Sequence, residues 1–216
     1  PVYAFTPSDS PLLSAAAVPP NVMLLIDDSG SMNNIIWASG FDPTVSRPQI
    51  ATCNSNSSCF GGQNLDMTDT NVFLSSLNRG GCASGWYGFN RGLLGLGSIC
   101  LKLPDPVGNQ NTRYTANYLS YLVTLANGVS RDFTTGSGAI PNDYRISVAQ
   151  DVSTSLVSNN RSLRIGLSTF NPPASGNPGP GGFIARAISD LAPVSGSVTQ
   201  AQADANYNAL INSING

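Results

Sequence analysis

Residues 21–32, NVMLLIDDSGSM, constrain the fold of this chain more than any other stretch. Residues 22–26 are all large and apolar, a pattern typical of a strand buried on both faces in a parallel sheet. Asp27, Ser29 and Ser31 follow in alternation, so an extended chain would place their side chains on one side. Because open α/β sheets bind ligands just beyond the carboxyl ends of their strands, we expect these three oxygen ligands to converge there.

The chemistry of these ligands predicts a metal site. One carboxylate and two hydroxyls, without thiol or imidazole, suit a hard divalent cation such as Mg²⁺, Ca²⁺ or Mn²⁺. The alternative is a strand-to-helix turn, in which Asp28 or Ser29 caps a helix and Gly30 relaxes the backbone. The apolar strand in front of the motif favours the metal site.

The composition indicates a secreted or surface protein rich in loops. Only 10% of the residues are charged, against about 25% in an average soluble domain. The chain also contains 22 Gly and 15 Pro. A net charge of −2 without a basic run argues against nucleic acid or an anionic membrane as a partner. No apolar stretch approaches the roughly 18 residues that a membrane span requires.

The four cysteines, Cys53, Cys59, Cys82 and Cys100, predict two disulfides and an oxidising compartment. Three pairings are possible. Loop closure is cheapest between neighbours, which favours Cys53–Cys59 and Cys82–Cys100. A zinc site is the competing interpretation, but the chain has neither a CxxC pair nor a histidine.

Residues 1–20 are rich in proline and show no sustained periodicity, so we predict an extended lead-in there, with a short edge strand near residues 2–5. Residues 33–112 lack a helical period and contain all four cysteines. We interpret them as a large insertion pinned by disulfides, because a structureless loop of this length is unusual in a compact domain. The insertion is either a recognition surface beside the metal site or a cover for a sheet edge. It would pack around an aromatic cluster of Trp37, Phe41, Phe60, Trp86, Tyr87 and Phe89.

Periodic segments follow the insertion. A helix of about four turns is predicted from an apolar stripe that we assign to plain core packing, formed by Tyr114, Tyr118, Tyr121, Leu122, Leu125 and Val129. A second helix, capped by Asn142 or Asp143, would bury Val148, Ala149, Val152 and Leu156.

Two strands and a last helix complete the prediction. Residues 163–170 predict a strand in which Gly166 lets a neighbouring backbone approach. Residues 183–188 predict a third strand, with Arg186 indicating a sheet edge. Thr199 and Gln202 have the spacing of a capping box, which would start a third amphipathic helix.

Four segments together resemble a known family: the strand ending in DDSGSM, the helical segments NYLSYL and DYRISVAQ, and the strand LRIGLSTFN. They are similar to the N-terminal von Willebrand factor type A domain of PilY/PilC-type proteins, the adhesins at the tips of bacterial type IV pili. The resemblance implies an α/β, Rossmann-like type A domain over residues 21–216, with the disulfide-bearing insertion after its first strand.

The resemblance also implies a location, partners and a cofactor. Such proteins are secreted through the periplasm to the bacterial surface and the pilus tip. They promote pilus assembly with minor pilins and contact surfaces or host receptors. In type A domains a divalent cation, Mg²⁺ or Ca²⁺, receives an acidic group of the receptor.

The most important departure from the family pattern concerns the completion of the metal site. Type A domains complete the metal site with a Thr and an Asp on two later loops, whereas this chain reaches only its third strand by Ile188. Only Asp27, Ser29 and Ser31 are therefore carried over as ligands, and Thr199 is better explained as a helix cap. We expect the chain to be the front part of a longer domain.

Three functions follow from these features. The first is metal-dependent adhesion, and the second is a structural priming module of a filament tip whose metal motif is not functional. The third, catalysis, is disfavoured because a chain without histidine can form no Ser-His-Asp or Cys-His arrangement. GxSxG and GxxxxGK motifs are absent as well.

Overall fold

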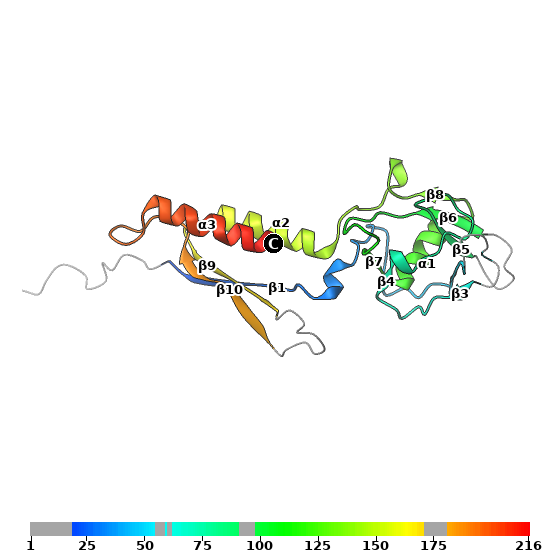
Figure 1. The fold of residues 1–216 in the computed structure, drawn as a ribbon, viewed down its shortest axis with the longest axis horizontal. Helices are drawn as coiled ribbons and strands as arrows, with labels where there is room; N and C mark the ends of the chain where they lie inside the picture. The colour runs from blue at the N-terminus through cyan, green and yellow to red at the C-terminus, as the bar shows by residue number, and fades with distance from the viewer. Residues whose placement is uncertain (1–18, 55–58, 60–61, 91–97, 171–180) are drawn as a thin grey trace, which may run out of the picture. The chain divides into compact units, whose positions relative to one another are not determined.

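The computed structural model describes residues 19–54, 59, 62–90, 98–170 and 181–216 (Figure 1). The edge strand expected near residues 2–5 and the side chain of Phe60 lie outside the described residues. The chain is mixed α/β and divides into two compact units. The sheet–helix unit consists of the chain up to Ile26 together with Val152–Gly216, and the inserted unit is Asp27–Asp151.

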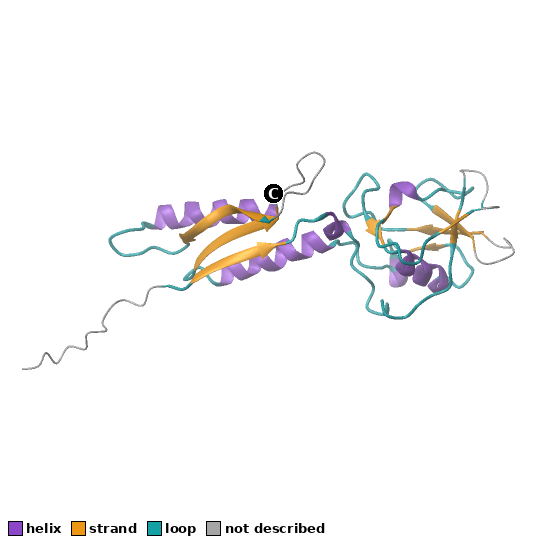
Figure 2. Cartoon of the chain, turned by 90° about the horizontal axis from the view of Figure 1, so that it is seen from below, coloured by secondary structure: helices purple, strands orange, loops and turns teal. Residues whose placement is uncertain are grey.

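The sheet–helix unit contains a three-stranded sheet in the order β1-β9-β10. β1 (Asn21–Ile26) pairs in parallel with β9 (Arg164–Phe170), and β10 (Gly182–Asp190) pairs antiparallel with β9. Parallel neighbours need a long crossover connection, and here it carries the whole inserted unit and α2 (Arg145–Asn159). Figures 1 and 2 show α3 (Gln200–Asn215) and the part of α2 from Val152 onward along the same face of this sheet.

Two burial predictions in this unit are wrong. β1 is not buried on both faces, since the Leu25 side chain is 64% exposed and that of Met23 is 40% exposed. The predicted face of α2 is also exposed: Val152 is 61% accessible, whereas Val157 is fully buried. In β1 the exposed side chains alternate with the more buried Leu24 and Ile26, because the described helices cover only one face of the sheet. In α2 the predicted face is exposed because no described element covers it.

Local sequence signals in the same unit are confirmed. Thr199 caps α3 in a full capping box with Gln202, whose side chain accepts a 2.9 Å hydrogen bond from the Thr199 N–H. Gly166 does allow a close approach, because a Cβ there would lie 2.8 Å from the carbonyl oxygen of Arg186 on the neighbouring strand.

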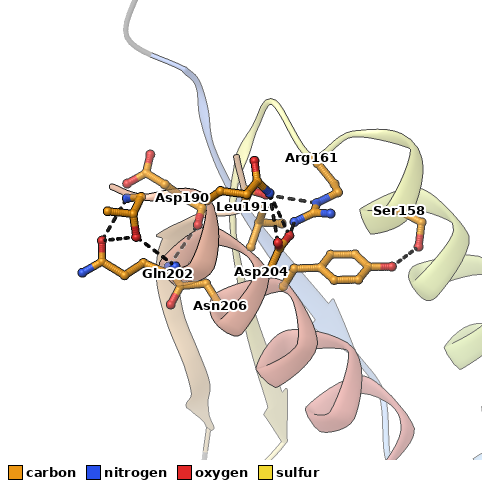
Figure 3. A network of polar contacts seen from close by, with 10 residues as sticks. Ser158, Arg161, Asp190, Leu191, Gln202, Asp204 and Asn206 are labelled. Atoms are coloured by element: carbon orange, nitrogen blue, oxygen red, sulfur yellow. Dashed lines mark hydrogen bonds and ion pairs between the residues drawn. The ribbon is translucent and has the colours of Figure 1, made fainter. Parts of the chain in front are cut away.

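Arg161 ties α3 to the end of the sheet (Figure 3). Its Nε donates a 3.0 Å hydrogen bond to the carbonyl of Leu191, just after β10, and its guanidinium pairs with Asp204 on α3. The same guanidinium lies 4.4 Å from the ring centroid of Tyr207. The hydroxyl of Tyr207 shares a 2.8 Å hydrogen bond with Ser158, so α2 joins the same network.

The inserted unit is built around a five-stranded sheet in the order β3-β2-β5-β6-β8. Its strands are β2 (Ala51–Thr52), β3 (Gln63–Asn64), β5 (Tyr87–Asn90), β6 (Ser98–Lys102) and β8 (Arg131–Asp132). A second ladder pairs β4 (Val72–Phe73) with β7 (Arg113–Tyr114). The described part of the unit also contains the helix α1 (Ala116–Leu125), the beginning of α2 up to Asp151, and the 3₁₀ turns η1 (Gly30–Asn33), η2 (Leu74–Ser76) and η3 (Gly136–Gly138).

Both disulfides have the favoured pairing, Cys53–Cys59 and Cys82–Cys100. The inserted unit also has its own core, which includes four fully buried aromatic side chains, Phe89, Tyr114, Tyr118 and Phe133. Of the predicted aromatic cluster, Trp37 and Phe41 are in contact, with ring centroids 5.1 Å apart.

The tyrosine helix belongs to this core and is shorter than predicted. α1 begins after Thr115, whose side chain accepts a hydrogen bond from the Tyr118 N–H. Asn127 and Gly128 have positive φ values of 50° and 81°, which end the helix before Val129. Val129 is consequently 68% exposed instead of buried.

Among the described residues, no helix is long and apolar enough to cross a membrane.

Candidate metal site

The three predicted metal ligands lie on one turn immediately after β1. Asp27 Oδ1 accepts a 2.8 Å hydrogen bond from the backbone N–H of Ser29. The hydroxyls of Ser29 and Ser31 are 2.9 Å apart and share a hydrogen bond. Both serine residues are exposed. The structure therefore brings the two hydroxyls together and places the carboxylate in the same turn.

The geometry that gathers them differs from the expected one. The chain is extended only as far as Ser29 and then turns into η1, where the N–H of Met32 donates to the carbonyl of Ser29 at 2.8 Å. Alternation along a strand is thus the wrong explanation for Ser31. A 3₁₀ turn has about three residues per turn and a rise of about 2 Å per residue, which keeps the chain after Ser29 compact enough for the two hydroxyls to meet.

The strand-to-helix turn considered as an alternative is also present. Ser29 occupies the N-cap position of η1, but its side chain makes no capping hydrogen bond. The Ser29 hydroxyl is instead directed to Ser31. The turn therefore forms without a hydrogen bond between the Ser29 hydroxyl and the backbone of η1, so this hydroxyl can still bind a ligand.

Arg113 is a neighbour of the motif that the sequence did not indicate. A Cβ on Gly30 would lie 2.8 Å from Arg113 Nη1, so the glycine is what allows the guanidinium this close. The guanidinium lies 4.5 Å from the ring centroid of Phe73 and donates a 3.1 Å hydrogen bond to Asn71 Oδ1. No local signal could have revealed this contact, because Arg113 reaches the motif through a parallel bridge to Asn34, beside which the Ile35 N–H donates a 2.9 Å hydrogen bond to the Arg113 carbonyl.

The donor set of the turn fits a hard cation in kind. Asp27, Ser29 and Ser31 supply three oxygens and one negative charge, whereas Mg²⁺ and Ca²⁺ take six or more oxygen ligands. Water or a partner would have to provide the others. Within the described part of the chain, no three His, Cys, Asp or Glu side chains form a cluster that could hold a metal ion. The predicted ligand set of Asp27, Ser29 and Ser31 includes only one such side chain, so this turn is a different kind of site from such a cluster.

In comparisons with protein-family models, curated proteins and solved structures, no match to this chain was found. The chemistry of the chain's own residues and the motif resemblance therefore indicate its function. In the Asp27–Ser31 turn, two of the predicted ligands, the serine hydroxyls, lie 2.9 Å apart, and the Asp27 carboxylate belongs to the same turn.

Proposed function

We propose that this chain is an adhesin module of the bacterial surface, associated with the type IV pilus tip, which binds surfaces or host receptors through a cation held by Asp27, Ser29 and Ser31. The observation that carries the proposal is the approach of the two serine hydroxyls to 2.9 Å, in the same turn as the Asp27 carboxylate. The two disulfides support an extracellular location.

Each residue has a distinct part in this proposal. Asp27 would supply the negative charge and the two serines neutral oxygens, so the cation would keep most of its own charge. A bound Mg²⁺ or Ca²⁺ would supply an electrophilic position for an acidic oxygen of the partner. The positive charge of Arg113 beside Gly30 weakens the attraction of the loop for a cation and strengthens its attraction for an acidic group.

The second candidate is a structural module for filament-tip assembly with minor pilins, in which the DDSGSM turn holds no cation. The close packing of Arg113 on Gly30 favours it, since this contact gives the motif a role in folding. The proposal assigns no catalytic step in either case, because the chain contains no histidine and Cys53, Cys59, Cys82 and Cys100 are all disulfide-bonded.

Replacement of Asp27 tests the adhesin proposal. Asp27→Ala is expected to lower the affinity for Mg²⁺ and Ca²⁺ at least tenfold, because it removes the charged ligand, and to abolish cation-dependent adhesion. Isothermal titration with each cation and binding to a surface coated with carboxylate groups measure the two effects. The matched control is Asp28→Ala, which removes the adjacent exposed carboxylate and should preserve both.

Two results would decide against the adhesin proposal. Adhesion that is independent of cations, and equal in the Asp27→Ala and parent proteins, contradicts it. The structural alternative would be established by two results together. The protein binds no cation, and pilus assembly requires the chain but tolerates both Asp27→Ala and chelation by EDTA. Circular dichroism of each variant separates these outcomes from a loss of fold.

A further inference from the structure

The inserted unit contains a pocket of about 390 Å³, within the range of small-molecule sites. Its apolar wall is formed by Trp37, Phe41, Pro43 and Met67. The polar wall combines hydroxyls, amides and one charge of each sign, from Ser31, Asn34, Asp69, Thr70, Thr115, Asn117 and Arg145. Every lining residue comes from Asp27–Asp151, so the pocket belongs to one compact unit.

Three side chains in this wall contain buried polar atoms without a hydrogen-bond partner among the described residues. Asn34 is only 2% exposed; its Nδ2 donates to the carbonyl of Ser31 at 2.8 Å, while its Oδ1 has no donor. Asn117 repeats the pattern, with Nδ2 donating to the carbonyl of Val45 at 3.0 Å and Oδ1 unpaired. Trp37 Nε1 is a donor without an acceptor.

These unpaired atoms indicate the polarity of a ligand. Buried polar groups are nearly always hydrogen-bonded, so each unpaired one calls for an explanation, such as a functional role or a bound water or ion. Two acceptors and one donor are left over, so a matching ligand must both donate and accept hydrogen bonds. A purely apolar ligand would leave all three unpaired.

The charges of the wall indicate a neutral ligand. The Arg145 guanidinium lies 5.3 Å from the ring centroid of Trp37, and Asp69 contributes a carboxylate to the same wall. Asp69 Oδ1 already accepts a 2.7 Å hydrogen bond from the Asn71 N–H, so its conformation is fixed by the loop. A ligand with net charge of either sign would meet one attractive and one repulsive group.

We propose that this pocket binds a neutral saccharide unit. Sugar hydroxyls donate and accept at once, which satisfies Asn34, Asn117 and Trp37 together. The aromatic and aliphatic side chains of the wall suit the apolar C–H face of a sugar ring. The site goes beyond the cation proposal: it shares only Ser31 with the three cation ligands, and no metal is required.

The experiment uses the full chain and neutral methyl glycosides of glucose, galactose, mannose and N-acetylglucosamine. The chain has two tryptophans, Trp37 and Trp86, so ¹⁵N NMR shows an indole N–H signal for each. At least one glycoside is expected to shift the Trp37 signal saturably while the Trp86 signal, outside the pocket, stays in place. The shift should persist in EDTA and in Asp27→Ala, which distinguishes this site from the cation site.

Variants locate the binding. Asn117→Leu and Arg145→Leu are expected to weaken glycoside binding at least tenfold. Arg131→Leu is the matched control, since Arg131 also lies over an aromatic ring, that of Phe133 at 5.0 Å, but does not line the pocket. If no glycoside shifts the Trp37 signal, or if acetate or phosphate alone does, the proposal is overturned. The proposal is also overturned if all three variants bind the glycoside equally well while circular dichroism shows that each is folded.

Discussion

Asp132 shows how a single partly buried carboxylate acquires a defined role in the inserted unit. Its Oδ1 accepts hydrogen bonds from the side chain and the backbone N–H of Thr134, at 2.5 and 2.7 Å. Its Oδ2 lies 3.1 Å from Lys102 Nζ on the neighbouring strand β6. These interactions favour the charged form, and they lower the pKa of Asp132 to about 2.

The lowered pKa predicts how stability depends on pH. Because the folded-state pKa is below the unfolded value of about 3.9, the contribution of Asp132 is complete above pH 4 and disappears as the pH falls through 2. Asp132→Asn should therefore lower the melting temperature at pH 7, and its difference from the parent should shrink between pH 4 and 2. Thermal melts across this range measure it, with Asp151→Asn as the control; a constant difference down to pH 2 contradicts the assignment.

At the scale of elements, the start of α3 is set by one hydroxyl. The Thr199 side chain accepts from the Gln202 N–H, and Gln202 Oε1 accepts from the Thr199 N–H at 2.9 Å. Two N–H groups that would otherwise lack an intrahelical partner are satisfied in this way. The helix then presents Ala203, Leu210 and Ile214 as its buried residues.

Removal of this cap should destabilise the sheet–helix unit measurably. Thr199→Ala is expected to lower the free energy of unfolding by about 1 kcal/mol, the typical value for loss of an N-cap side chain. Thr199→Ser keeps the hydroxyl and serves as the control, with a much smaller change. Urea unfolding followed by far-UV circular dichroism measures both variants, and an equal loss in the two would show that the methyl group and not the cap matters.

At the scale of the whole molecule, the two disulfides fall within one compact unit and close loops of different length. Cys53–Cys59 has a sequence separation of 6 and Cys82–Cys100 one of 18. In the chain-entropy description, the longer loop gives the larger restriction of the unfolded chain. The second disulfide also joins β6 to the loop before β5.

This difference can be measured by removing each pair. Replacing Cys82 and Cys100 by Ala should cost about 3 kcal/mol, and about 1 kcal/mol more than replacing Cys53 and Cys59 by Ala. Hydrogen exchange of the β5 and β6 amides in each double variant reports the loss within the inserted unit. A larger effect from the shorter loop would show that native contacts, and not loop entropy, control the stabilisation.

The sequence by itself determined the features that depend on neighbours along the chain. The apolar run before Asp27, the strand 163–170, the pairing of the cysteines and the Thr199 cap all follow from local composition, loop length or hydrogen bonds over three residues. The convergence of Ser29 and Ser31 was also expected, although a 3₁₀ turn and not an extended strand produces it.

Only the tertiary structure decided which surfaces are covered and which distant residues meet. Leu25 and Val152 have the pattern of buried positions yet are exposed, because burial depends on what packs against a face and not on the face itself. The contact of Arg113 with Gly30 likewise depends on the bridge between Asn34 and Arg113, two residues far apart in the sequence. The saccharide pocket combines residues from 31 to 145, so no local pattern in the sequence could encode it.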